Sequence, residues 1–357
     1  MDDLYFLNFA PQPYYYPPPP KPNVRLEVNQ NSWMIGEVVI SRHVSEPSGP
    51  CWGDGKGAFF TISEAPNPKP PARPISDACP IKDHVLYEPC PYGVFEIGLA
   101  YLAIYPNKGT PEHLTLEALA KMSLSFQVPK VYYHGVHNDL YYIVYSALPG
   151  RTICEVWPET NDLAVKKRWL EQIVDACVEL SAVSGQSMTG ITGDTLAELW
   201  LSKDNAETPG SYTPDVLLQN CQDIGMDCSN LVFQQNNLTP LTFTIDESGK
   251  LLGIYHWQDA GFLPKDWIAT KGRFNSSLLA VNRMRSWPRG EGTKWASGIN
   301  YFLRERGFHP FSIKHNEWRT ACRREREARE RETVQDRQKM WEMEKSREKG
   351  KQRENSI

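Results

Sequence analysis

Two short runs in the second half of the chain carry the side chains whose types could do chemistry. They supply amide, hydroxyl, imidazole and carboxylate groups, from Gln235, Asn237, Thr242, His256, Gln258 and Asp259. An amide cannot take up a proton at neutral pH, so neither Gln235 nor Asn237 can act as a general base. Neutral imidazole suits zinc or copper better than magnesium, but a single histidine in a sheet is more often a hydrogen-bonded core residue than a metal ligand. We therefore expect a polar site with no bound metal.

The eight cysteines give no further site. They are scattered, none forms a Cys-x-x-Cys pair, and no pair of histidines accompanies them at zinc spacing. Cys177 falls on the apolar face of an expected helix, which favours packing over reactivity. This use of cysteine indicates buried or idle thiols in a reducing, cytoplasmic setting.

The first half of the chain is expected to consist mainly of strands. They are rich in β-branched and aromatic residues, and they comprise Met34–Ile40, Ala58–Ser63, Val94–Tyr105, Val128–Tyr132 and Tyr141–Tyr145. The run Gly53–Gly57 predicts a turn between the first two strands, which includes Lys56. A short helix is expected over Pro111–Ser123.

The hydrophobic period becomes helical after Leu148–Gly150. Asn161 is expected to cap a helix that places Trp169, Cys177 and Leu180 on one face. Two more helices are expected, at Thr195–Leu201 and Trp295–Arg306, together with strands at Leu231–Phe233, Leu241–Ile245 and Leu251–Tyr255. Strands first and helices later predict the α+β class with two lobes, a β-rich N-lobe and a mainly helical C-lobe.

Several segments resemble, in order and spacing, the aminoglycoside-phosphotransferase and choline-kinase-like family. They are Val128–Tyr132, Tyr142–Val144 with Leu148–Thr152, and Ile254–Phe262. Pro264–Lys271 resembles an extension of the fungal branch. The match runs roughly over 33–318 and is strongest over 128–271. It implies a two-lobed protein-kinase-like fold and, for the family, phosphate transfer from ATP to a small hydroxyl compound.

In this family an aspartate in a His-x-Asp-x-x-x-x-Asn run deprotonates the acceptor hydroxyl, and that asparagine and a later aspartate hold magnesium. Leu238 and Pro240 fix the register of the run here. The resemblance then implies that Gln235 and Asn237 stand at the histidine and base positions, that Thr242 and His256 stand at the two metal positions, and that Gln258 replaces the following glutamate.

The family also uses a strand lysine, held by a helix glutamate, to steady the phosphates. The strand Tyr101–Tyr105 has no lysine, and Glu117 looks like the helix glutamate without its partner. Tyr145 and Ser146 complete the expected cleft. Asp259 is the carboxylate nearest to the metal position. If it belongs to a strand, its side chain points to the face opposite His256 and cannot replace the metal ligand. If it lies in a turn, this argument is weaker.

The replacement of base, metal ligands and lysine predicts a pseudokinase that binds a small molecule or a protein partner between its lobes. The alternative is a divergent ATP-dependent small-molecule phosphotransferase, or an enzyme of other chemistry in the same cleft. We expect no cofactor, although weak or magnesium-independent ATP binding is compatible with the sequence. We expect no specific nucleic-acid binding, and the pattern does not indicate an oligomeric state.

The two ends of the chain are expected to lie outside the lobes. The division is a tail over 1–32, an N-lobe with an extension over 33–147, a C-lobe over 148–316, and a charged helix or disordered tail over 317–357. The tail contains Pro17–Pro20, which could bind an SH3- or WW-type groove but more simply forms a solvated segment. The first residues do not resemble a signal peptide, and no stretch of about 18 apolar residues indicates a membrane span.

Overall fold

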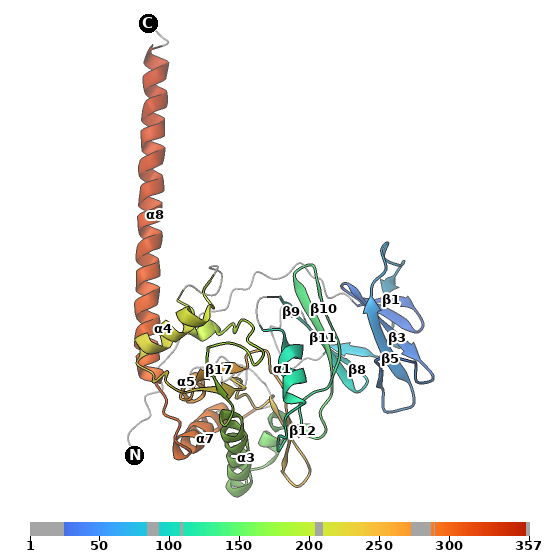
Figure 1. Cartoon of the computed structure of the whole chain (residues 1–357). Helices are drawn as coiled ribbons and strands as arrows, with labels where there is room; N and C mark the ends of the chain where they lie inside the picture. Colours follow the sequence, from blue (N-terminus) through green and yellow to red (C-terminus); the bar gives the residue numbers. More distant parts are fainter. Residues whose placement is uncertain are drawn as a thin grey trace.

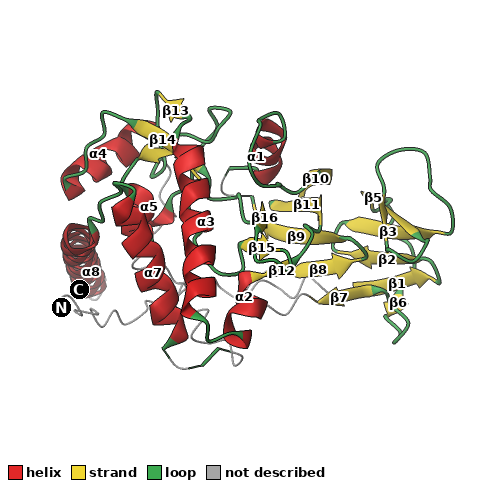
Figure 2. Cartoon of the chain, turned by 90° about the horizontal axis from the view of Figure 1, so that it is seen from below, coloured by secondary structure: helices red, strands yellow, loops and turns green. Residues whose placement is uncertain are grey.

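The computed structural model describes residues 25–83, 93–107, 110–203, 210–272, 287–288 and 290–354. Pro17–Pro20 and Cys90 lie outside these residues. Strands dominate the first part of the chain and helices the second (Figure 1, Figure 2). The expected α+β class, with a β-rich N-terminal lobe and a mainly helical C-terminal lobe, is confirmed.

The first sheet consists of antiparallel strands in the order β4-β5-β3-β2-β1-β6. They are β1 (Arg25–Asn29), β2 (Ser32–Ile35), β3 (Val38–His43), β4 (Trp52–Gly53), β5 (Phe59–Glu64) and β6 (Arg73–Pro74). The single strand expected over Met34–Ile40 is wrong. Gly36 has a φ of 59° and turns the chain between β2 and β3, a conformation that glycine adopts without a steric penalty. The expected turn over Gly53–Gly57 lies between β4 and β5, which pair with each other.

The second sheet has the order β10-β11-β9-β8-β7. Its strands are β7 (Ile81–Asp83), β8 (Val94–Ile97), β9 (Ala100–Pro106), β10 (Val131–His137) and β11 (Leu140–Ser146), and helix α1 (Glu112–Leu119) lies between β9 and β10 in the chain. The β region expected over Val94–Tyr105 is confirmed, divided by a turn at Gly98. A Cβ atom on Gly98 would lie 2.7 Å from the carbonyl oxygen of Gly53, so glycine allows the first sheet to approach closely here.

Alternate residues of β9 and β11 point to opposite faces of the second sheet. Leu102 and Val144 face the first sheet and share a core with its Phe60. Ala103 and Ile143 point the other way and belong to the core of the C-terminal lobe. The second sheet is therefore covered on both faces, by the first sheet and by the C-terminal lobe.

The C-terminal lobe combines helices with two small sheets. Its helices are α2 (Ile153–Val156), α3 (Leu163–Ser181), α4 (Pro214–Ile224), α5 (Trp267–Lys271), α7 (Glu291–Glu305) and α8 (Ser312–Glu354), with 3₁₀ turns at Trp157–Glu159 and Leu199–Leu201. One sheet contains β12 (Arg151–Thr152), β15 (Phe243–Ile245) and β16 (Leu251–Ile254), and the other contains β13 (Ser184–Gly185), β14 (Leu231–Gln234) and β17 (Gly261–Pro264). The helix expected over Thr195–Leu201 is wrong, because only its last three residues form a 3₁₀ turn. The cap of α3 is Asp162 rather than Asn161.

Tryptophan rings fill the core between α3 and α7. Trp157 stacks on Trp287 with 5.7 Å between ring centroids, and it meets Trp295 edge-on at 5.3 Å. The indole N–H of Trp157 and the ammonium of Lys166 both donate to Oε2 of Glu291, each at 2.8 Å. These bonds satisfy a carboxylate that would otherwise be costly to bury.

Helix α8 begins on the C-terminal lobe and then leaves it (Figure 1). At its base His315 donates to the carbonyl oxygen of Trp200 at 2.9 Å, and Arg319 donates to that of Ser202 at 2.7 Å. Past Cys322 the described side chains are exposed, apart from the half-buried Arg326. Helix α8 starts at Ser312, before the boundary expected at residue 317. At the other end, β1 starts at Arg25, before the start of the N-lobe expected at residue 33. No helix in the described ranges is both long and apolar enough to cross a membrane.

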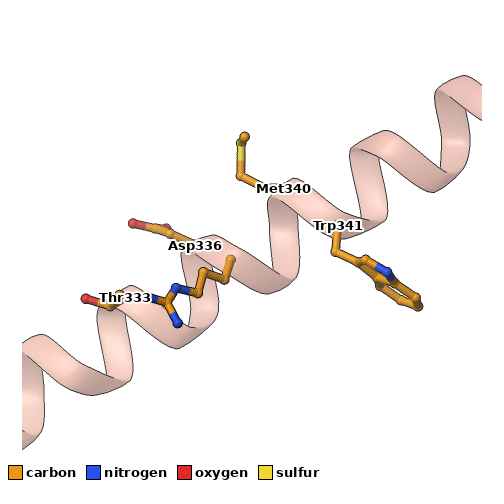
Figure 3. A pocket seen from close by; sticks show the side chains of 5 residues that line it. Thr333, Asp336, Met340 and Trp341 are labelled. Carbon is orange, nitrogen blue, oxygen red and sulfur yellow. The ribbon is translucent and has the colours of Figure 1, made fainter.

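A shallow hollow on α8 is not a binding site. It is lined by Thr333, Asp336, Arg337, Met340 and Trp341 (Figure 3). All five side chains project from a single exposed helix, so they cannot enclose a ligand.

Candidate functional site

Two connections between strands form the candidate site. One joins β14 to β15 and contains residues 235–242, and the other joins β16 to β17 and contains residues 255–260. They meet because β14 pairs with β17, with Gln234 opposite Gly261, while β15 pairs with β16. The fold therefore brings together the two polar runs of the sequence.

Gln235 bridges these two connections. Its side chain is buried, and Nε2 donates to the carbonyl oxygens of Tyr255 and His256 at 2.9 and 2.8 Å. Its Oε1 accepts from the backbone N–H of Asn237 at 2.7 Å. Both ends of the amide are thus used within the chain, and Gln235 fixes the position of Asn237 relative to His256.

The residues at the expected base and metal positions are hydrogen-bonded to one another. Oγ1 of Thr242 lies 3.2 Å from Nδ1 of His256 and 3.5 Å from Oδ1 of Asn237. Thr239 adds a second hydroxyl at 3.0 Å from the first. His256 has a φ of 60°, a left-handed conformation that is uncommon for a residue other than glycine. The result is a cluster of side chains that bond to one another, at positions where the family resemblance implies a base and metal ligands.

Helix α1 contributes a buried carboxyl that the sequence interpretation missed. Glu112 is 3% exposed, and its Oε1 accepts from the backbone N–H of Trp257 at 2.9 Å. Its Oε2 is buried and has no hydrogen-bond partner among the described residues. Burial raises the pKa of Glu112 to about 7; the Trp257 N–H opposes this change and Asp259 adds to it.

Glu112 is buried, whereas Glu117, the helix glutamate expected from the resemblance, is exposed on α1. Five residues of helix separate it from Glu112, which turns the two side chains apart by about 140°. The signal that could have identified Glu112 is its place directly after Pro111, since proline favours the start of a helix and an acidic residue there favours the positive end of the helix dipole.

Asp259 lies in a turn, so strand alternation does not direct its side chain away from the site. Its Oδ2 is 3.6 Å from Nζ of Lys271, whose shorter contact is with Oε2 of Glu198 at 2.9 Å. Burial alone would lower the pKa of Lys271, but Glu198 and Asp259 outweigh burial and raise it. The carboxylate nearest to the expected metal position is therefore paired with a buried cation.

Three tyrosine rings pack between the second sheet and the 255–260 connection. The centroids of Tyr101, Tyr145 and Tyr255 are 6.1 to 6.2 Å apart in each pair. The hydroxyl of Tyr255 accepts from the backbone N–H of Leu148, in the segment that joins the two lobes. Burial raises the pKa of Tyr145 and Tyr255, so both phenols stay neutral. The nearby Ser146 uses its hydroxyl to accept from a backbone N–H at 2.9 Å.

The residues of the site do not fit a magnesium ion. Magnesium requires hard oxygen ligands in octahedral geometry. Here Asp259 is paired with Lys271, and Glu112 has a raised pKa and accepts from a backbone N–H. Within the described ranges, no three His, Cys, Asp or Glu side chains are grouped so that they could hold a metal. His134 stacks face to face on His113 with 3.6 Å between centroids, a geometry in which the two rings lie parallel instead of converging on an ion.

Comparisons with known proteins give structural similarities only. The chain matches no protein-family model and no curated sequence. It is similar to the crystal structure of an aminoglycoside 3′-phosphotransferase of type VIII, with 14% identity over 67% of this chain and 94% of that one and a TM-score of 0.42. A GDP complex of an aminoglycoside 2′-phosphotransferase IIIa variant gives 15% identity, coverages of 65% and 88%, and a TM-score of 0.37. The crystal structure of monomeric WbdD gives 11% identity over 80% of this chain and 63% of that one, with a TM-score of 0.34.

Proposed function

We propose that this chain is a pseudokinase of the aminoglycoside-phosphotransferase type, which binds a small molecule or a protein partner between its lobes and transfers no phosphate. One observation carries the proposal: Thr242, at a metal position, is hydrogen-bonded to both His256 and Asn237. Atoms that would have to receive a metal ion and a substrate hydroxyl already satisfy one another.

The chemistry of these residues supports the same conclusion. An amide at position 237 cannot remove a proton, and loss of a positioned general base typically lowers a rate by about 10² to 10⁴. Without a bound divalent ion, the charge on a transferring phosphoryl group has no compensation at this site. The carboxylate of Asp259 lies 3.6 Å from the ammonium of Lys271, which it shares with Glu198.

The Tyr255 contact supports a changed ligand preference. Backbone N–H groups of the segment between two lobes are fixed donors for a ligand that binds there, and Tyr255 already bonds to the N–H of Leu148. A planar base would have to displace a buried ring to reach this donor. We therefore expect nucleotides to bind weakly or not at all.

We also propose that the protein is located in the cytoplasm. The cysteines of the described residues are all free thiols, which is typical of a reducing compartment.

The test is a thermal-shift titration with ATP, with and without magnesium. The parent chain is expected to show no magnesium-dependent shift. The double variant Asn237→Asp with His256→Asp places one carboxylate at the base position and one at a metal position. We expect a magnesium-dependent shift to appear in this variant. A ligand at 100 times its Kd stabilises the native state by about 2.7 kcal/mol, which such a titration detects.

The matched control is Asn31→Asp, which adds a carboxylate in the exposed turn between β1 and β2. It should behave like the parent chain. A magnesium-dependent shift of the parent, together with transfer of labelled phosphate from ATP to a hydroxyl compound, would disprove the proposal. It would favour the alternative of a divergent phosphotransferase, for which Asp259 is the remaining candidate ligand and Asp259→Asn the decisive variant.

A further inference from the structure

The end of α4 brings two cysteines together. Cys221 is completely buried, and Cys228 is half-buried and packs against the same core. The helix ends at Gly225 with a φ of 86°, and the N–H of Met226 donates back to the carbonyl oxygen of Cys221 at 3.0 Å. This pair of features is typical of a turn that reverses the chain after a helix. The reversal directs Cys228 back toward the last turn of α4.

Two bonds of Met226 keep the two cysteines close together. The thiol of Cys228 donates to the carbonyl oxygen of Met226 at 3.7 Å, which keeps the side chain close to the helix end. The side chains of Cys221 and Cys228 belong to the same core cluster, and both are free thiols. The neighbouring Cys221 lowers the pKa of Cys228, while Cys228 and burial raise the pKa of Cys221.

Other cysteines of the lobe lack this combination of features. Burial raises the pKa of Cys154 to about 11 and that of Cys177 to about 12, and both are buried. Their thiolate forms are scarce at neutral pH, and it is the thiolate that attacks a hydroperoxide. Cys228 combines partial exposure, a lowered pKa and a neighbouring thiol, which are the properties of a redox-responsive cysteine with a resolving partner.

We propose that Cys221 and Cys228 form a redox-responsive dithiol, which a hydroperoxide converts into an intramolecular disulfide. The Cys228 thiolate attacks the O–O bond of the hydroperoxide; an S–O bond forms, and the alcohol, or water from hydrogen peroxide, leaves. The Cys221 sulfur then attacks the Cys228 sulfur, the S–S bond forms, the S–O bond breaks, and the departing hydroxide takes the Cys221 proton to give water. Two thiols are oxidised by two electrons in total, and the hydroperoxide is reduced by two.

The disulfide would connect the end of α4 to the segment that enters β14. Strand β14 (Leu231–Gln234) runs directly into Gln235, which holds the two connections of the candidate site together. The dithiol therefore lies at the start of the segment that positions the site.

The test uses the full chain, reduced and freed of reductant, then treated with a low excess of hydrogen peroxide and alkylated. Peptide mapping without reduction is expected to find Cys221 linked to Cys228, while Cys154 and Cys177 stay reduced. Reducing agent should reverse the link. The partly exposed Cys51 and Cys79 are internal controls in the same sample, and we expect Cys228 to be oxidised at least about tenfold faster than either.

Two variants distinguish the two steps. In Cys221→Ala the reaction should stop at the sulfenic acid of Cys228, which a dimedone probe traps. In Cys228→Ser the buried Cys221 should stay reduced. Circular dichroism checks that each variant folds, and the parent chain alone already decides the outcome. Oxidation of Cys228 no faster than that of Cys51, or a link from Cys228 to any cysteine other than Cys221, would overturn the proposal.

Discussion

Replacement of Glu112 by glutamine should change how stability depends on pH. In the folded chain burial raises the pKa of Glu112 from 4.5 to about 7. The unfolded chain therefore loses this proton at lower pH than the folded chain does. As pH rises through this window the folded state binds more protons than the unfolded state, so stability falls, and the loss is complete above the folded pKa.

The size of the effect follows from these two pKa values. One pKa unit corresponds to about 1.4 kcal/mol, so the full penalty on the folded state is about 3 kcal/mol. Between about pH 5 and about pH 8 the portion that develops is about 2.5 kcal/mol. Glutamine does not titrate, and its amide oxygen can still accept from the Trp257 N–H. Glu112→Gln should therefore gain about 2.5 kcal/mol relative to the parent chain over this interval.

Urea unfolding of both chains at the two pH values measures this double difference. Groups that titrate identically in the two chains cancel, as does any pH-independent cost of placing an amide in the buried site. Glu117→Gln is the matched control, because it makes the same chemical change at an exposed position of the same helix and should give a double difference near zero. If Glu112→Gln and Glu117→Gln behave alike, the carboxyl of Glu112 is hydrated in solution and the reasoning from burial fails.

Three further predictions concern stability and are measured by urea unfolding. Tyr255→Phe removes the acceptor of a backbone N–H between the lobes and should cost about 1–2 kcal/mol; an unchanged midpoint would show that water replaces the hydroxyl. Gly150→Ala should cost about 2 kcal/mol or more, because the new Cβ would lie 2.3 Å from a carbonyl oxygen. Its control is Gly193→Ala, which has the same φ but open space around the Cβ position and should cost only about 1 kcal/mol. Lys271→Met leaves a buried carboxylate without its cation and should cost about 3–5 kcal/mol, against at most about 1 kcal/mol for Lys203→Met in an exposed pair.

The sequence predicted the elements whose patterns are local. The helix that follows Asp162 and the strands β15 and β16 were expected, because an apolar face and a run of strand formers can be recognised from neighbouring residues alone. The break at Gly36 was missed, since Ile35 and Val38 on either side of the turn are strand formers and the residue types do not reveal the positive φ. The packing of the first sheet on the second was also out of reach, because it depends on contacts between residues far apart in the chain.

The candidate site was predicted in its parts but not in its contacts. The two runs around Asn237 and His256 were singled out, and the fold brings them within hydrogen-bonding distance of the same hydroxyl. The buried Glu112 was missed although the start of α1 was expected at Pro111, because which face of a helix is buried depends on packing against distant residues. The pairing of Cys221 with Cys228 depends on a chain reversal after Gly225 that cysteine spacing does not reveal.

The C-terminal helix has a consequence for measurements of size in solution. Helix α8 has 43 residues, and at about 1.5 Å per residue it is about 65 Å long. A compact chain of 357 residues has a radius of gyration of only about 20 Å. An arm of this length adds friction without adding much mass, so a monomer should elute from a sizing column ahead of compact standards of its own mass. Elution volume alone would then suggest a dimer, and light scattering, which reports mass independently of shape, is the measurement that distinguishes the two.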